Sequence, residues 1–101
     1  MSFTHSVFFE LEDGSPAAVE ELLRACREDL AGHAGEEGFF AGARAEGYER
    51  EVNDLAFHVA LSIRFEDRAA HDAYQVSDRH ARFIERCRAN WRAVRVFDAE
   101  G

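Results

Sequence analysis

The sequence predicts an α+β fold whose elements follow the order β-α-β-β-α-β. Two segments, residues 3–12 and 55–65, alternate between apolar and polar or small side chains with the period of two that is typical of a strand. Two other segments, residues 16–30 and 78–89, repeat apolar residues at helical spacing. Strands and helices that alternate in this way predict one antiparallel sheet with helices packed against it.

Composition limits the size and the partners of the protein. The chain has 101 residues, 47% of them hydrophobic, and nine are phenylalanine, which predicts one domain over residues 1–101 with one core. The net charge of −8 argues against binding to nucleic acid or to an anionic membrane surface. The sequence shows no signal peptide and no long apolar run, so we expect a cytoplasmic protein.

The first strand and the first helix have clear signals. Alternation over residues 3–12 turns His5 toward the core, among the large apolar side chains of its strand. Ser15 is a good N-cap and Pro16 suits the first position of a helix, while Gly32 ends that helix.

The middle of the chain is harder to interpret. Residues 36–47 predict a second strand, in which Gly38 and Gly42 mark a bulge or a close approach of another backbone. A polar connection follows, and residues 55–65 predict the third strand with one wholly apolar face. His58 lies on its other face, either at an interface between two sheets or in solvent.

The last third predicts a helix broken in two and a final strand. Asp67 caps a short helix that ends near Tyr74, and Ser77 or Asp78 caps the next. One apolar stripe follows the second helix, made of Phe83, Ile84, Cys87 and Trp91, and His80 lies on the same stripe. Residues 94–98 predict the fourth strand.

This order corresponds to a split βαβ, ferredoxin-like arrangement, a four-stranded antiparallel sheet with helices on one face. Apolar residues also occur on the other face, as Phe8 and Ala60 show. Because an exposed apolar face of that size usually marks an interface, we expect a homodimer in which two sheets face each other.

The candidate site is built around His80, which the helical spacing turns toward the core. A neutral histidine can take a proton from a carbon next to a carbonyl, and a tyrosine hydroxyl can hold the oxygen as charge builds on it. Tyr74 lies close enough in sequence to serve, and His5 points into the same core. Phe9 and Phe83 are predicted to help bind a small apolar carbonyl compound. The alternative is a buried polar cluster that only specifies the core.

Metal and thiol chemistry have little support. His71 and His80 are too far apart for one helix face, and no closely spaced histidine pair or acidic cluster is present, so we predict no metal and no cofactor. Cys26 and Cys87 lie on apolar stripes without a CxxC motif, which predicts buried, reduced thiols; a nucleophilic role is the weaker alternative.

The order and spacing of four segments resemble the stress-responsive A/B barrel domain family. They are His5–Phe9, Ile63–Asp67, the Tyr74-to-His80 spacing followed by Phe83, and the run from Asn90 to Asp98. The resemblance covers essentially the whole chain and implies a dimeric α+β barrel. In this family some members bind a cation near the dimer interface, mostly through backbone oxygens.

A relative in that family is the plant polyketide cyclase that makes olivetolic acid by an aldol step without a cofactor. The resemblance places its catalytic His on His80, its Tyr on Tyr74 and an inward His on His5, whereas its His-Pro pair is replaced by Ser77-Asp78. It implies a cofactor-free cyclase; other dimeric α+β barrels are cofactor-free monooxygenases. The remaining alternatives are a small-molecule binding module and a non-catalytic dimer.

Overall fold

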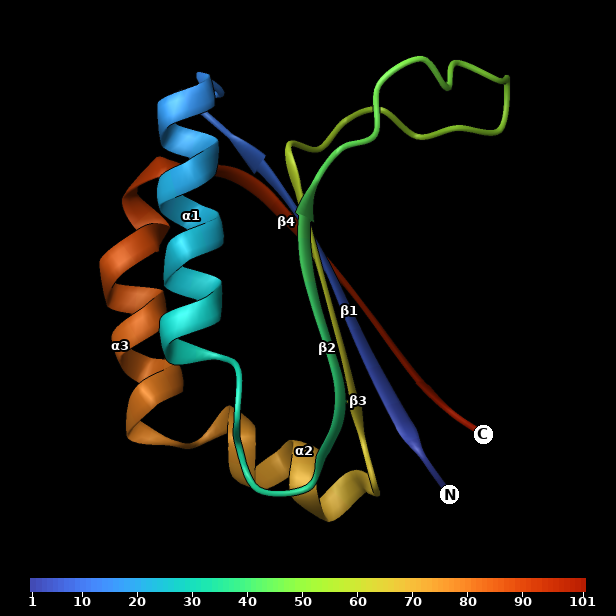
Figure 1. Cartoon of the computed structure of the whole chain (residues 1–101), viewed down its shortest axis with the longest axis vertical. Coiled ribbons are helices and arrows are strands. Elements are labelled where there is room, and N and C mark those ends of the chain that lie inside the picture. Colours follow the sequence, from blue (N-terminus) through green and yellow to red (C-terminus); the bar gives the residue numbers. More distant parts are fainter.

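The computed structural model describes residues 1–101 and has the predicted order of elements (Figure 1). The elements are β1 (Phe3–Leu11), α1 (Pro16–Asp29), β2 (Glu36–Ala43), β3 (Val59–Phe65), α2 (Arg68–Gln75), α3 (Asp78–Cys87), the short 3-10 turn η1 (Arg88–Asn90) and β4 (Trp91–Glu100). No helix has the length and the apolar character that crossing a membrane requires.

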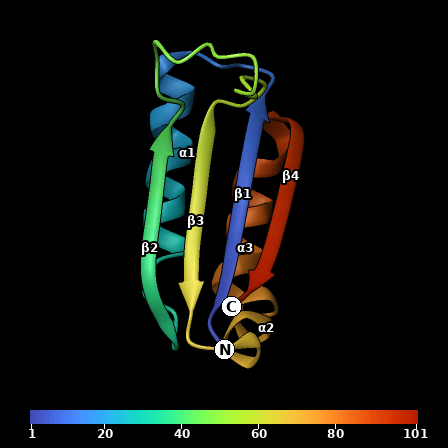
Figure 2. The same ribbon diagram turned by 90° about the vertical axis from the view of Figure 1, so that its right-hand side faces the viewer.

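The four strands form one antiparallel sheet in the order β2-β3-β1-β4. The helices lie on one face of this sheet, and Figure 2 shows the other face with the helices behind it. The predicted ferredoxin-like α+β fold is confirmed. In this order β1 is central and β4 is an edge strand, so β1 contacts both β3 and β4.

Three predicted caps begin the three helices. The side-chain oxygen of Ser15 accepts the N–H of Ala18 at 3.2 Å, and that of Asp67 accepts the N–H of Ala70 at 2.8 Å. Ser77, rather than Asp78, caps α3. Each cap satisfies one of the backbone donors that a helix leaves free at its start, which fixes where the helix begins.

The core lies between the sheet and the helices. Strand β1 is buried at every second residue, as its sequence alternation predicts. The alternate residues of β3 are buried with it, and Leu22, Leu23 and Cys26 of α1 belong to the same buried cluster. Burial of these side chains is the main favourable term that holds helices and sheet together.

Strand β3 is shorter than predicted, because it begins at Val59 and not at residue 55. Residues 55–58 continue the alternating pattern in the sequence, but the backbone carbonyl groups of two of them accept hydrogen bonds from a side chain and not from a neighbouring strand. Nη1 of Arg44 donates to the carbonyl oxygens of Leu55 and Phe57 at 2.7 and 3.1 Å. Since these acceptors are already satisfied, the segment has less need of a neighbouring strand.

His58 does not lie freely in solvent, which was one of its two predicted environments. It is half-buried at the end of β1, where Nδ1 accepts the N–H of Leu11 at 2.9 Å and the backbone N–H donates to the carbonyl of Phe9 at 2.7 Å. A Cβ atom on Gly14 would lie 2.2 Å from His58 Nε2, so glycine at this turn makes room for the imidazole.

Two other boundaries differ from the prediction. Strand β2 ends at Ala43 and not at residue 47, although its register shifts between Glu36 and Gly38, which confirms a bulge there. Helix α3 ends at Cys87, so Trp91 opens β4 instead of extending the helical stripe. Trp91 nevertheless packs on the predicted stripe, with its ring 5.8 Å from that of Phe83.

The face of the sheet opposite the helices carries exposed aromatic side chains. Phe40 of β2 is 58% exposed and Phe97 of β4 is 55% exposed. Phe8 of β1 lies between them in the sheet, and its ring packs edge-on against those of Phe57 and Phe97 at 5.2 and 5.9 Å. This patch, Phe8, Phe40, Phe57 and Phe97, is called the open-face patch below.

Candidate functional site

A cavity of about 160 Å³ lies between the sheet and α2–α3. Its lining is mostly hydrophobic and includes all five residues singled out by the sequence: His5, Phe9, Tyr74, His80 and Phe83. The rest of the lining consists of Val7, Leu61, Gln75, Ile84, Trp91, Val94 and Val96. Elements far apart in the sequence therefore bring the predicted residues to one place.

Ser77 fixes the spacing of Tyr74 and His80 at the joint between α2 and α3. Its hydroxyl donates to the carbonyl oxygen of Tyr74 at 2.8 Å and accepts the backbone N–H of His80 at 3.1 Å. One side chain thus ends one helix and starts the next. This places Tyr74 and His80 with their rings 4.9 Å apart in an edge-on arrangement.

Four imidazoles surround the ring of Tyr74. The ring centroids of His80, His33, His5 and His71 lie 4.9, 5.0, 5.7 and 6.4 Å from it. Tyr74 is only 2% exposed. Burial raises the pKa of Tyr74, and Cys26 and Glu36 raise it further, so its hydroxyl keeps its proton and is a donor.

His5 has a carboxylate partner that the sequence did not indicate. Asp98 lies directly opposite His5 in the β1–β4 register, and its Oδ1 is 2.6 Å from His5 Nδ1. On the other side of the imidazole, the amide nitrogen of Gln75 is 3.5 Å from His5 Nε2. Asp98 and Gln75 were both missed; the signal for Asp98 was its place on the strand that pairs with β1.

Burial keeps both cavity histidines neutral. It lowers the pKa of His5 by more than the hydrogen bond and the charge of Asp98 raise it. Burial also lowers the pKa of His80. The positive charges of His5, His33 and His71, when these are protonated, lower the pKa of His80 further. A neutral imidazole in an apolar cavity is able to accept a proton near pH 7.

His71 was given no role from the sequence but is buried beside the site. Its ring stacks on that of Phe3 at 4.1 Å and lies 5.0 Å from that of His5. One ligand-capable atom each of His5, His71 and Asp98 lies within 4.8 Å of the others. The prediction of no metal rested on the spacing of His71 and His80 and on the lack of a closely spaced histidine pair or acidic cluster along the chain, whereas this cluster comes from β1, α2 and β4.

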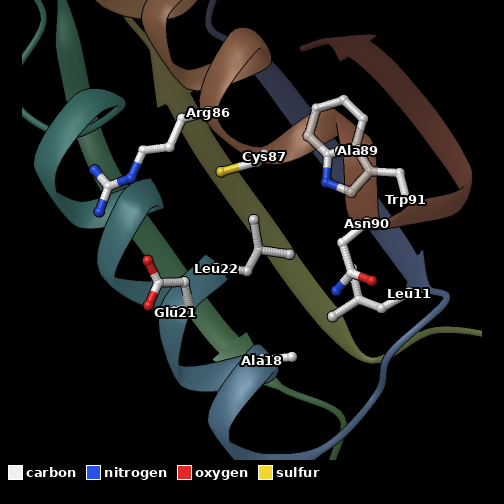
Figure 3. Close-up of a pocket in the computed structure, with 9 residues that line it drawn as sticks. All are labelled: Leu11, Ala18, Glu21, Leu22, Arg86, Cys87, Ala89, Asn90 and Trp91. Atoms are coloured by element: carbon white, nitrogen blue, oxygen red, sulfur yellow. The ribbon is translucent and has the colours of Figure 1, made fainter.

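A second cavity of about 140 Å³ has α1 residues on one side and Cys87, Asn90 and Trp91 on the other (Figure 3), and Trp91 lines both cavities. Side chains of α1, including Glu21 and Leu22, face Cys87 and Trp91 across it. Burial raises the pKa of Cys87 to about 11 and that of Cys26 to about 12. Both thiols are free and stay protonated, which argues against a nucleophilic role.

Comparisons with known proteins agree with this architecture. Residues 3–100 match the family model described as Stress responsive A/B Barrel Domain. No curated protein matches the chain.

Solved structures of low sequence identity share its fold. A protein from Mesorhizobium loti MAFF303099, described as a Dabb family protein with a ferredoxin-like fold, is 20% identical. Its TM-score is 0.81 over 99% of this chain and 96% of its own. A dimeric ferredoxin-like protein of unknown function from Jannaschia sp. CCS1 is 24% identical, with a TM-score of 0.79 over all of both chains (100% and 100%). A hydroxynitrile lyase from Passiflora edulis is 14% identical, with a TM-score of 0.72 over 97% and 91%.

Proposed function

The chain belongs to the stress-responsive A/B barrel domain family, and we propose that it binds a small apolar carbonyl compound in the cavity and moves a proton on it. The observation that carries this proposal is a mostly hydrophobic cavity with the neutral imidazole of His80 at its wall, beside Tyr74 and His5. A site with apolar walls and a few converging polar groups is the usual form of a small-molecule site.

The volume of the cavity limits the substrate. An apolar protein cavity of about 150 Å³ holds a molecule of benzene. A cavity of about 160 Å³ therefore suits a carbonyl compound of about one ring. The hydrophobic side chains of Phe9 and Phe83 would contact its apolar part.

The chemistry follows from the proton balance. The imidazole of His80 takes a proton from the carbon next to the carbonyl, and the electron pair of that C–H bond forms the double bond of an enolate. The negative oxygen is stabilised by a hydrogen bond from Tyr74, with the amide of Gln75 as a second donor close to His5. Return of the proton from His80 to carbon completes one cycle. In an aldol step the enolate carbon instead bonds to a second carbonyl carbon, and the alkoxide that forms takes the proton from His80, so the base is restored without an organic cofactor.

The supporting residues have separate tasks. Asp98 holds His5 through Nδ1, which orients its Nε2 toward the Gln75 amide. We assign His5 an orienting or substrate-binding role and His80 the role of base. The structure of the same fold from Passiflora edulis is described as a hydroxynitrile lyase, which supports the proposal that this fold can hold an enzyme active site.

We also propose that the chain forms a homodimer through the open-face patch. Two aromatic side chains of the patch, Phe40 and Phe97, are more than half exposed. A relative of the same length and fold is described as dimeric. Pairing of two such faces would bury apolar area that otherwise contacts water.

We also propose that the protein is located in the cytoplasm. The two free cysteines support this location, because thiols stay reduced there.

The test is proton exchange on a model substrate. Acetophenone in D₂O is incubated with the protein, and loss of its methyl proton signal is followed by NMR. We expect exchange above the buffer rate, and a loss of about 10²–10⁴-fold in His80→Gln, the usual contribution of a general base. His58→Gln, which changes a histidine outside the cavity, is the matched control.

Two results would contradict the proposal. If His80→Gln exchanges as fast as the unchanged protein, His80 is not the base. If acetophenone binds with no exchange above buffer, the cavity is a binding site without turnover. Tyr74→Phe and Gln75→Leu, measured in the same assay, identify which of the two donors stabilises the enolate.

A further inference from the structure

The buried face of α2 meets the first and last strands at a cluster of three ligand-capable side chains. His5 comes from β1, His71 from α2 and Asp98 from β4. One ligand atom of each lies within 4.8 Å of those of the other two. The proton-transfer mechanism gives His71 no role and uses the contact between Asp98 and His5 only to orient His5.

His71 carries a buried nitrogen with no hydrogen-bond partner. The residue is 8% exposed, and its Nε2 is buried and unpaired. Its Nδ1 lies 3.1 Å from Oδ1 of Asp72, which is mostly exposed. Because an ionised carboxylate only accepts, Nδ1 donates to Asp72, and Nε2 is left as a bare acceptor. A buried polar atom without a partner is unfavourable, so this nitrogen needs a ligand.

We propose that His5, His71 and Asp98 bind a divalent first-row transition metal ion. Two imidazoles and one carboxylate form a donor set that suits such ions, and three protein ligands leave a further position open. The contact between Asp72 and His71 has the form found around metal-binding histidines, in which the nitrogen that does not bind the metal donates to a carboxylate.

An ion reaches the cluster from outside the substrate cavity. An open cleft of about 320 Å³ at this end of the sheet is lined by both His71 and Asp98. Asp72 and Glu100 also line it, and Glu100 is paired with Arg68. The Asp98 side chain is 39% exposed, so one of the three ligands is open to solvent.

Metal binding at His5, His71 and Asp98 does not require any reaction in the cavity, so it goes beyond the proposed proton transfer. An ion bound here replaces the proton that His5 and Asp98 share across 2.6 Å. The Gln75 amide contacts the opposite nitrogen of His5. Metal binding and substrate binding therefore use opposite sides of the same imidazole.

The experiment is titration of the full, metal-stripped chain with Zn²⁺ by calorimetry, and with Co²⁺ by visible absorption. We expect one ion per chain and cobalt bands of a histidine-bound ion. His71→Phe, which keeps an aromatic ring on Phe3, and Asp98→Ala should each abolish binding. His33→Gln should bind as the unchanged chain does. Mg²⁺, which prefers oxygen ligands, should not compete.

A milder variant keeps the test valid if the other two fail to fold. Asp72 is exposed, and Asp72→Asn removes only the carboxylate that orients His71, so we expect affinity to fall about 10–100-fold. The proposal is overturned if the unchanged chain binds neither ion. It is also overturned if His71→Phe, Asp98→Ala and Asp72→Asn bind as tightly as the unchanged chain.

Discussion

The imidazole of His5 and the carboxylate of Asp98 meet 2.6 Å apart at directly opposed positions of β1 and β4. An ionised carboxylate can only accept a hydrogen bond, so Nδ1 of His5 carries the proton between them. That choice leaves Nε2 as the acceptor on the side of the Gln75 amide. The chemical state of His5 is thus set from the last strand of the fold.

Asp98→Ala should destabilise the protein by about 1–3 kcal/mol. The change leaves the buried Nδ1–H of His5 without its acceptor, and hydrogen bonds to charged groups are at the strong end of the usual range. Urea unfolding followed by circular dichroism measures the effect. Glu51→Ala, which removes an exposed carboxylate in a loop, is the control. Equal effects of Asp98→Ala and Glu51→Ala would show that the pair with His5 adds no stability.

Ser77→Ala should lower the free energy of unfolding by about 0.5–2 kcal/mol, as loss of an N-cap does. The same change removes the bond to the Tyr74 carbonyl, so the spacing of Tyr74 and His80 should loosen. Ser77→Asp keeps a capping oxygen for the His80 N–H and should restore most of the stability. Thermal unfolding of the three proteins provides the comparison. A Ser77→Asp variant as unstable as Ser77→Ala would refute the capping explanation.

Acid should weaken the fold through His80. Burial lowers the pKa of His80 below its ordinary value of 6.5 in the folded chain. As pH falls through 6.5, the unfolded chain takes up a proton there that the folded chain does not, so the free energy of unfolding falls. This loss continues until pH reaches the lowered pKa, and stability is regained as pH rises again.

The measurement is urea unfolding at several values between about pH 7 and pH 5, the range in which histidines titrate. His80→Gln should reduce the slope of stability against pH without removing it, because burial also lowers the pKa of His5. An unchanged slope in His80→Gln would mean that His80 does not titrate differently in the folded and unfolded chains.

A charge on the open-face patch should dissociate the proposed homodimer. Phe97 is 55% exposed, so Phe97→Glu has little effect on the core of one protomer but places a carboxylate in an apolar interface. Sedimentation equilibrium should give the mass of one chain for Phe97→Glu and of two for the unchanged protein. Val76→Glu, at an 84% exposed position between α2 and α3, is the control and should leave the dimer intact. A monomeric unchanged protein would disprove the dimer.

Local signals in the sequence were sufficient for most of the fold. The alternation of β1 turned His5 inward, and the caps at Ser15 and Asp67 fixed the starts of two helices, because each depends on a few neighbouring residues. The predicted start of β3 at residue 55 was wrong. The hydrogen bonds that Arg44 donates to Leu55 and Phe57, just before β3, join residues more than ten positions apart. Such contacts leave no periodic signal in the chain.

The candidate site was predictable only where a residue carried its own signal. His80 and Tyr74 followed from helical spacing, whereas Asp98 and Gln75 become relevant only through the register of β4 against β1 and the packing of α2. His71 did have a signal, since it precedes Tyr74 by three residues and so shares its helix face. It was overlooked because histidines were compared along the chain and not across elements.

The edge position of β4 has a consequence for exchange between the cavity and solvent. Strand β4 is bonded to β1 on one side only. It contributes Val94 and Val96 to the lining of the cavity and Asp98 to the pair with His5. Local opening of an edge strand leaves the remaining strands paired and requires less free energy than global unfolding. The amide hydrogens of β4 should therefore exchange with deuterium before those of β1 and β3. Each such opening parts Asp98 from His5 and widens the cavity on the side of β4.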